Sequence, residues 1–282
     1  MNDRKETEDT AGQIVRKILS SPKYRELGIP EESVEDIVKR EISRQTDIKV
    51  AEKKAREKLH QVIAPYLGDP DYRLADTALT QIHRDDREGL KAWCLEMLRS
   101  HSSTRERLPN LELFYQTVFE FTGKPNTVLD LACGMNPFAF PWMGLEPSVR
   151  YYAFDLHTPR VNLINRFFDA WGLQPLATVT DVLVQVPQTP ADVAFFFKEA
   201  HRFESRRKGS NRAFFQQLSV KWIVVTLPAE NLTGRHQMRD RERMLIEKTI
   251  TGLDWEISET EVGTEMIFFI RNNIAIFITR DK

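Results

Sequence analysis

Two apolar runs, each ending at an aspartate, limit the fold of this chain more than its other features do. The first run carries Asp130 near its end and opens into a loop of small residues through Gly134. The second run follows about one helix and one strand later and ends at Asp155. A parallel βαβ unit has this order, with the loop at the carboxyl end of the first strand and an acidic side chain that accepts hydrogen bonds from a ribose. The spacing therefore predicts a doubly wound α/β fold that binds a nucleoside.

The loop itself, residues 132–137, reads Ala-Cys-Gly-Met-Asn-Pro and lacks the Gly-x-Gly-x-x-Gly spacing of dinucleotide sites. A pyrophosphate needs those glycines for the close approach of the backbone, whereas S-adenosylmethionine has no phosphate. The loop therefore favours S-adenosylmethionine as the cofactor and a methyltransferase as the class of enzyme. An ordinary strand-to-helix turn in another α/β protein is the alternative.

Two further positions extend the candidate cofactor site. Asp181 follows the next short apolar run, where an adenine would be read, although an aspartate of a turn or helix cap would look the same. Ser103 and Glu106 have the spacing of a capping box at a helix start. Arg107 stands beside them at the junction of two regions, and an arginine binds carboxylates in a bidentate manner. We interpret Arg107 as the clamp for the methionine carboxylate.

The composition describes a globular protein without a predicted membrane segment. The chain has 282 residues, 41% of them hydrophobic and 29% charged. It contains no run of about 18 apolar residues, and its first thirty residues lack the apolar segment of a signal peptide. Cys94 and Cys133 lie far apart, with neither metal-binding nor disulfide spacing. We expect a monomer in the reducing cytoplasm, with no metal and no membrane partner.

The texture of the sequence changes near residue 109. Residues 1–108 show helical periodicity, whereas residues 109–282 alternate short apolar strands with helical segments. We expect strands at residues 127–131, 151–154, 177–179, 193–197 and 222–227, followed by a terminal hairpin of residues 266–270 and 274–279 that turns at 271–273. This order predicts the Rossmann-like sheet of S-adenosylmethionine-dependent methyltransferases behind a helical N-terminal domain.

Two local basic clusters stand out from a net charge of −1. Residues 49–58 carry five bases against two acids on a predicted helix, and a solvated helix face is the alternative to a phosphate-binding one. Residues 198–209 also carry a basic excess, at the end of the predicted fourth strand. Because a methyltransferase holds its acceptor beside that strand end, the second cluster favours a polyanionic acceptor.

These segments resemble the aminoglycoside-resistance 16S ribosomal RNA methyltransferases, which modify N7 of guanine 1405. The resemblance rests on the sequences His-Ser-Ser-Thr-Arg-Glu-Arg at 101–107, Leu-Asp-Leu-Ala-Cys-Gly-Met-Asn-Pro-Phe at 129–138, Phe-Asp at 154–155 and the region of Lys198. It also includes the Ser-Pro-Lys-Tyr sequence at 21–24 and the Lys-Leu-His-Gln sequence at 58–61, and so spans nearly the whole chain.

The resemblance implies a transfer from S-adenosylmethionine to a purine of 16S rRNA, with the N-terminal helices docking on the 30S subunit. It implies a positioning mechanism without a catalytic side chain, because guanine N7 has a free lone pair. The cofactor-binding residues would be Arg107, Ala132, Gly134, Asp155, Leu156, Asp181 and Val182. The RNA-binding residues would be Lys23, Lys54, Arg56, Lys58, Lys198, Arg202, Arg206, Arg207, Lys208 and Arg235.

The chain departs from the family pattern near the acceptor. It reads Val-Thr-Leu-Pro at 225–228, where the family tends to read Ser-Phe-Pro, and Arg-Asp-Arg-Glu-Arg-Met at 239–244 in place of a tyrosine-bearing pattern. Two alternatives therefore stay open. One is methylation of another rRNA position, such as N1 of an adenine, and the other is a ribosome-binding homologue without turnover.

Overall fold

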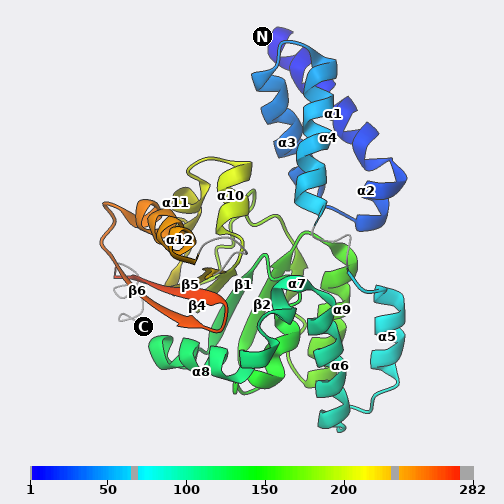
Figure 1. Cartoon of the computed structure of the whole chain (residues 1–282). Helices are drawn as coiled ribbons and strands as arrows, with labels where there is room; N and C mark the ends of the chain where they lie inside the picture. The colour runs from blue at the N-terminus through cyan, green and yellow to red at the C-terminus, as the bar shows by residue number, and fades with distance from the viewer. Residues whose placement is uncertain (1, 65–68, 230–234, 274–282) are drawn as a thin grey trace.

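A computed structural model describes residues 2–64, 69–229 and 235–273 of the chain. Within these ranges, four N-terminal helices stand apart from a seven-stranded sheet that is flanked by helices (Figure 1). The predicted fold class is confirmed. No helix of the described ranges is both long and apolar enough to cross a bilayer.

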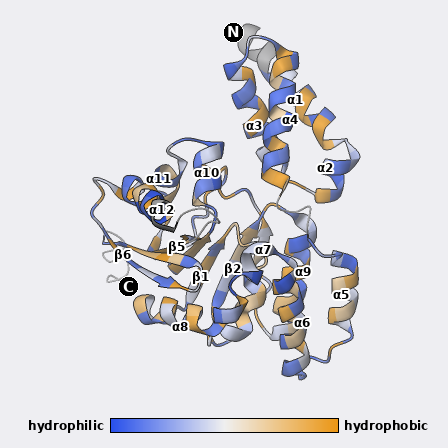
Figure 2. Ribbon diagram, viewed as in Figure 1, coloured by the Kyte–Doolittle hydropathy of each residue, from blue (hydrophilic) through white to orange (hydrophobic). Residues whose placement is uncertain are grey.

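The N-terminal helices are α1 (Asn2–Leu19), α2 (Pro22–Leu27), α3 (Glu31–Arg44) and α4 (Ile48–Ile63). Helix α2 starts at Pro22 after Ser21, and α3 starts at Glu31 after Pro30, because the beginning of an α-helix tolerates proline. Helices α1, α3 and α4 carry both hydrophobic and hydrophilic residues (Figure 2). Their buried apolar residues, with Ile18, Val34, Leu59 and Ile63 among them, form a hydrophobic cluster of their own.

The next helices precede the first strand and belong to the α/β part of the chain. They are α5 (Tyr72–Thr80), α6 (Arg87–Ser100), α7 (Ser102–Arg105) and α8 (Leu111–Thr122), with a 3-10 turn, η2 (Leu108–Asn110), before α8. Side chains of α5 and α6 pack in the same cluster as Phe138 and Phe167 from the α/β part. The hydrophobic clusters thus divide the chain before α5, whereas the change of sequence texture placed the boundary at residue 108.

The sheet has the strand order β3-β2-β1-β4-β5-β7-β6. Its parallel part comprises β1 (Thr127–Leu131), β2 (Arg150–Asp155), β3 (Ala177–Val179), β4 (Ala191–Phe197) and β5 (Val220–Pro228). The connecting elements are η3 (Asn136–Trp142), α9 (Thr158–Trp171), α10 (Ala200–Arg206), α11 (Ser210–Phe215) and α12 (Arg235–Ile250). Since β1 and β4 connect to opposite sides, the order reverses between them, and ligands of open α/β sheets bind at such a switch point.

The terminal hairpin differs from the predicted one. It pairs β6 (Trp255–Val262) with β7 (Glu265–Asn272), and β7 also runs antiparallel to β5. The turn therefore falls at Gly263, whose φ of 60° suits a glycine, and not at residues 271–273. The predicted strand at 274–279 lies outside the described residues. In β6, five of the six residues 256–261 are exposed. This strand therefore lacks the apolar run from which the other strands could be predicted.

Candidate active site

A cavity of about 390 Å³ lies at the carboxyl ends of the parallel strands and extends to helices α3 and α4. All seven predicted cofactor-binding residues line it. Ile37, Arg40 and Arg44 of α3 and Lys58 of α4 line it from the N-terminal helices. The cavity is thus lined both by the N-terminal helices and by the α/β part of the chain.

The loop after β1 is fastened to the second strand. Ala132 and Gly134 have φ angles of 53° and 55°, in the left-handed region that glycine tolerates and alanine rarely adopts. The N–H of Cys133 donates to the carbonyl of Phe154 at 2.8 Å, and the N–H of Gly134 donates to Oδ2 of Asp155 at 3.0 Å. These bonds hold the backbone in a tight curve at the cavity wall.

Asp155 is 3% exposed, and its two carboxylate oxygens accept three hydrogen bonds. Besides Gly134, the N–H of His157 and Nη1 of Arg160 each donate at 3.0 Å. Arg160 also pairs with Asp69, at 2.6 Å, so a chain of charges extends from the cavity to the segment before α5. The carboxylate is fixed in orientation, and of its roughly four lone-pair sites about one, on Oδ1, remains for a ligand.

Asp181 makes the turn contact that its sequence position allowed, and its role at an adenine stays a prediction. Its Oδ1 accepts from the N–H of Leu183 at 3.1 Å, as in a turn, and its Oδ2 lies 2.6 Å from Nη2 of Arg206. Arg206 and Arg207 approach Asp36 of α3 within 3.5 and 3.2 Å. The guanidinium of Arg206 therefore joins the third strand end to the N-terminal helices.

Arg107 is buried and bound to protein groups. Its Nε and Nη2 donate to the two carboxylate oxygens of Glu265 at 3.0 and 2.7 Å, and its Nη1 donates to Oδ1 of Asn136 at 2.9 Å. Oδ1 of Asn136 also accepts from the hydroxyl of Tyr115 at 2.6 Å. Arg107 lines the cavity, but the carboxylate that it binds in this structure is Glu265. Its role as the clamp for the methionine carboxylate stays a prediction.

A second buried carboxylate lies behind the loop. Oδ2 of Asp130 accepts hydrogen bonds from Asn136 Nδ2 at 3.0 Å and from the hydroxyl of Tyr151 at 2.7 Å. Burial raises the pKa of Asp130 to about 7, and these two donors oppose that rise. Asp130 therefore supports the loop through Asn136.

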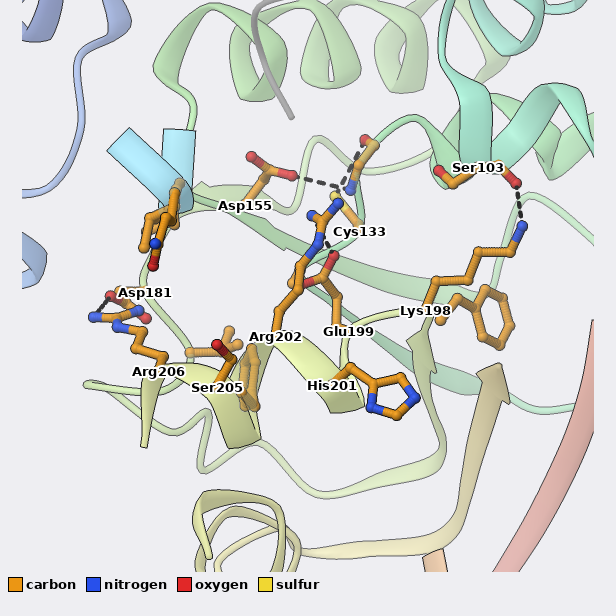
Figure 3. A pocket seen from close by; sticks show the side chains of 18 of the residues that line it. Ser103, Cys133, Asp155, Asp181, Lys198, Glu199, His201, Arg202, Ser205 and Arg206 are labelled. Atoms are coloured by element: carbon orange, nitrogen blue, oxygen red, sulfur yellow. Dashed lines mark hydrogen bonds and ion pairs between the residues drawn. The ribbon is translucent and has the colours of Figure 1, made fainter. Parts of the chain in front are cut away.

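The end of β4 brings two adjacent charged residues to the cavity (Figure 3). Lys198, with a φ of 62°, donates from Nζ to Glu106 at 2.7 Å and to the carbonyl of Ser103 at 3.1 Å. Glu199 accepts from Nη1 of Arg202 at 2.9 Å. Burial raises the pKa of Glu199 to about 7. Glu199 is a cavity residue that the sequence analysis did not select.

The predicted RNA-binding residues divide into several groups. Lys58, Lys198, Arg202 and Arg206 line the cavity. Lys23, Lys54 and Arg56 lie on α2 and α4, where they contact His60, Glu57 and Glu52 respectively. Lys208 is exposed, and Arg207 contacts Asp36. Arg235 begins α12, but its side chain lies outside the described residues.

One smaller expectation was wrong. Ser103 does not cap a helix with Glu106, since α7 already starts at Ser102 and Glu106 binds Lys198. The segment 239–244, which departs from the family pattern, lies on helix α12. In the described part of the chain, no three His, Cys, Asp or Glu residues are grouped to hold a metal.

The site also depends on residues that the sequence analysis missed. Arg160 and Glu265 form ion pairs with the predicted residues Asp155 and Arg107, and Asp69 in turn pairs with Arg160. Arg160 lies five residues after Asp155, in the first turn of α9, and this short spacing is a local sequence signal for the ion pair between them. Asp69 and Glu265 lie 91 and 158 residues from their partners, so local patterns carry no signal for them.

Residues 20–270 match the family model described as ribosomal RNA methyltransferase (FmrO). The chain belongs to this family. Among its relatives is a 16S rRNA (guanine(1405)-N(7))-methyltransferase of Micromonospora echinospora, 29% identical over 94% of this chain and 97% of the relative. Another, from Serratia marcescens, carries the same name and is 30% identical over 91% of this chain and 96% of the relative.

Solved structures agree with this assignment. The 16S rRNA methyltransferase RmtF in complex with S-adenosyl-L-homocysteine has a TM-score of 0.75 and 27% identity, covering 93% of this chain and 98% of that one. The 16S rRNA methylase RmtB has the same TM-score and coverage with 26% identity. The resemblance inferred from the sequence, the methyltransferase sheet and the class of enzyme are confirmed for this rRNA methyltransferase.

Proposed function

We propose that this chain transfers a methyl group from S-adenosylmethionine to N7 of guanine 1405 of 16S rRNA in the 30S subunit. One observation carries the proposal. The seven residues selected from the sequence as cofactor contacts line a single cavity at the switch point of the sheet, and basic residues of the N-terminal helices line the same cavity. Its relatives and the rRNA methyltransferase bound to S-adenosyl-L-homocysteine support the choice of donor and acceptor.

The residues present fit S-adenosylmethionine, which supplies a methyl group on a positively charged sulfur. The curved loop at Ala132 and Gly134 brings backbone close to the cavity without the glycine spacing that a pyrophosphate needs. Asp155 would accept hydrogen bonds from ribose hydroxyls. Leu156, Asp181 and Val182 would surround the adenine, and Arg107 would hold the methionine carboxylate.

The chemistry requires alignment more than proton transfer. Guanine N7 carries its lone pair in the plane of the ring, so its attack on the methyl carbon needs no general base. The protein must hold the acceptor in line with the methyl group, and positioning can supply most of the acceleration. A paired guanine would be flipped out of its helix at a cost of a few kcal/mol, which contacts to the extruded nucleotide offset.

The N-terminal helices would dock the enzyme on the assembled subunit. Lys23, Lys54, Arg56 and Lys58 lie on α2 and α4, and Lys58 also reaches the cavity. Phosphate contacts of this kind fix the register of a protein on a nucleic acid without reading its sequence. We place the reaction in the cytoplasm, where the monomeric enzyme would meet 30S subunits. As in the family that the sequence resembles, 30S subunits methylated in this way would be resistant to aminoglycosides.

The test is transfer of labelled methyl from S-adenosylmethionine to isolated 30S subunits, with free 16S rRNA as the second substrate. Borohydride and aniline cleavage followed by primer extension then maps the modified nucleotide. A strand break at guanine 1405 that appears with 30S subunits but not with free 16S rRNA supports both the reaction and the docking role of the N-terminal helices. Methylation of an adenine, or 30S binding without methylation, would replace this function with one of the two alternatives.

A further inference from the structure

Glu199 is a carboxylate of the cavity that is not among the proposed cofactor residues. It follows β4, the strand next to β1, and it lines the same cavity as Cys133, Gly134 and Asp155. Lys198 turns the backbone there with its φ of 62°, and Glu199 lies among the side chains around the pocket (Figure 3). Apart from Arg107, the proposed cofactor residues lie at the ends of β1, β2 and β3, so we assign the β4 side of the switch point to the acceptor.

Glu199 differs from the other strand-end carboxylates in its hydrogen bonds. Asp130 accepts two hydrogen bonds from side chains, and Asp155 accepts three. Asp181 is bound by Leu183 and Arg206. Glu199 accepts one, from Arg202 to Oε1, and no group of the described residues donates to Oε2. A carboxylate offers about four lone-pair sites, so most of the acceptor capacity of Glu199 is available to a ligand.

We propose that Glu199 selects guanine at the methylation site by accepting hydrogen bonds from its N1–H and its N2 amino group. This inference rests on the proposed function and names a base-recognition residue within it. The Watson–Crick edge of guanine has two adjacent donors, which a carboxylate can accept together. Adenine has an unprotonated N1 at that edge, whose lone pair would face the carboxylate. Arg202 holds the carboxylate in place from the side of α10.

The same contact favours the reaction itself. In the transfer, the N7 lone pair forms the new N–C bond while the C–S bond breaks and its electron pair stays on sulfur. The positive charge thereby moves from the sulfonium to the purine ring. A charged purine is a stronger donor at N1–H, so its hydrogen bond to Glu199 strengthens as the reaction proceeds. Interactions that strengthen in the transition state raise kcat.

The environment of Glu199 gives this contact a pH dependence. Burial, together with Asp155 on β2, raises the pKa of Glu199 to about 7, although Arg202 on α10 and Arg160 on α9 oppose this rise. The ionised carboxylate is the acceptor of both guanine donors. Activity should therefore rise with pH through about 7, as Glu199 loses its proton.

The experiment compares the full-length wild type with Glu199→Gln and with Glu247→Gln, an exposed control on α12. Methyl transfer is measured on 30S subunits that carry guanine or adenine at position 1405, and binding of S-adenosylhomocysteine is measured by calorimetry. Glu199→Gln should lower kcat/KM on the guanine substrate by about 10- to 100-fold, the effect of losing one charge-assisted hydrogen bond. The control should match the wild type.

Two further readouts separate base recognition from a structural role. Because a glutamine presents one acceptor and one donor, it matches the edge of adenine, and the guanine-to-adenine ratio should fall by about tenfold or more. The rise of kcat through pH 7 should disappear in Glu199→Gln. Affinity for S-adenosylhomocysteine should stay within about twofold of the wild type, a small change on the affinity scale.

An unchanged base ratio, or a loss explained by weaker binding of S-adenosylhomocysteine, overturns the role of Glu199 while leaving the proposed function intact. An inactive wild type on guanine-bearing 30S subunits would overturn the function and, with it, this assignment. If Glu199→Gln fails to fold, Glu199→Asp serves instead. It keeps the charge at a shorter reach, and it should lower kcat while retaining the preference for guanine.

Discussion

Arg107 and Glu265 form a buried bidentate ion pair, with N–O distances of 3.0 and 2.7 Å, between residues 158 positions apart in the chain. The pair joins the segment before α8 to the start of β7, and Glu265 also lies 3.4 Å from Nζ of Lys198. The attraction to Arg107 holds the pKa of Glu265 below its usual value, against the rise that burial would cause. One ion pair thus connects the proposed cofactor clamp to the end of β4.

Removing one partner of this pair should destabilise the fold strongly, because it leaves an uncompensated charge in the interior. We expect Arg107→Ala and Glu265→Ala each to lower the free energy of unfolding by about 3–5 kcal/mol. The double variant should lose less free energy of unfolding than the sum of the losses of the two single variants. Urea denaturation of the four proteins measures this coupling, and additive losses would show that the two residues do not act as a pair.

Arg107→Lys tests the clamp. A lysine keeps the positive charge but cannot hold a carboxylate through two parallel hydrogen bonds. If Arg107 binds the methionine carboxylate, affinity for S-adenosylhomocysteine should fall by about tenfold, the effect of one lost charge-assisted hydrogen bond. Calorimetry measures the affinity, and circular dichroism checks the fold. An unchanged affinity would assign Arg107 to the structure alone.

Asp155→Asn removes the negative charge of the carboxylate that would bind the ribose. We expect affinity for S-adenosylhomocysteine to fall by about 10- to 100-fold, since a hydrogen bond to a charged group contributes about 1.5–3 kcal/mol. Asp240→Asn, at an exposed aspartate of α12, is the matched control. Full activity of Asp155→Asn on 30S subunits would remove Asp155 from the cofactor site.

The acidic strand ends could be predicted because their signal is local. Asp130, Asp155 and Asp181 each follow an apolar run within a few residues, and parallel strands bring such ends to one edge of the sheet. The strand β6 could not be found in this way. It is an exposed edge strand with charged residues, as edge strands commonly are, so it lacks a continuous apolar run.

The partners of the site residues depend on the tertiary fold. Arg206 belongs to a basic run that favoured RNA contact, yet it lies 2.6 Å from Asp181. Asp36, on a helix 170 residues earlier in the sequence, completes its surroundings at 3.5 Å. A charge run gives no information on which of its members face inward, because that depends on how α10 packs against α3. For this reason the sequence predicted which residues line the cavity better than it predicted which basic side chains are exposed to solvent.

Arg206 and Lys208 should therefore respond differently to alanine. Arg206 keeps 12% of its side chain exposed, so Arg206→Ala should destabilise the fold by less than the ~3–5 kcal/mol of a fully buried pair. Lys208 is exposed, and Lys208→Ala should leave stability unchanged. If Lys208 contacts a phosphate, its loss should reduce the salt slope of 30S binding by about one. Unfolding and filter binding at several salt concentrations measure both effects, and a reversed pattern would contradict the assignment.

Asp130→Asn should change how stability depends on pH. Burial raises the pKa of Asp130 in the folded protein to about 7, above its usual value of 3.8. Between these values the folded state binds a proton that the unfolded state lacks, so this residue stabilises the fold at low pH and loses that contribution as pH rises to about 7. The contribution changes by about 1.4 kcal/mol per pH unit within this range.

An asparagine keeps an oxygen that can accept from Asn136 and Tyr151, but it does not titrate. Denaturant unfolding of wild type and Asp130→Asn at pH 5, 6, 7 and 8 isolates the effect, because the other titrating groups cancel in the difference. The variant should gain stability relative to the wild type from pH 5 to 7, and the gain should level off above pH 7. A difference that stays constant from pH 5 to 8 would mean that Asp130 is already ionised at pH 5.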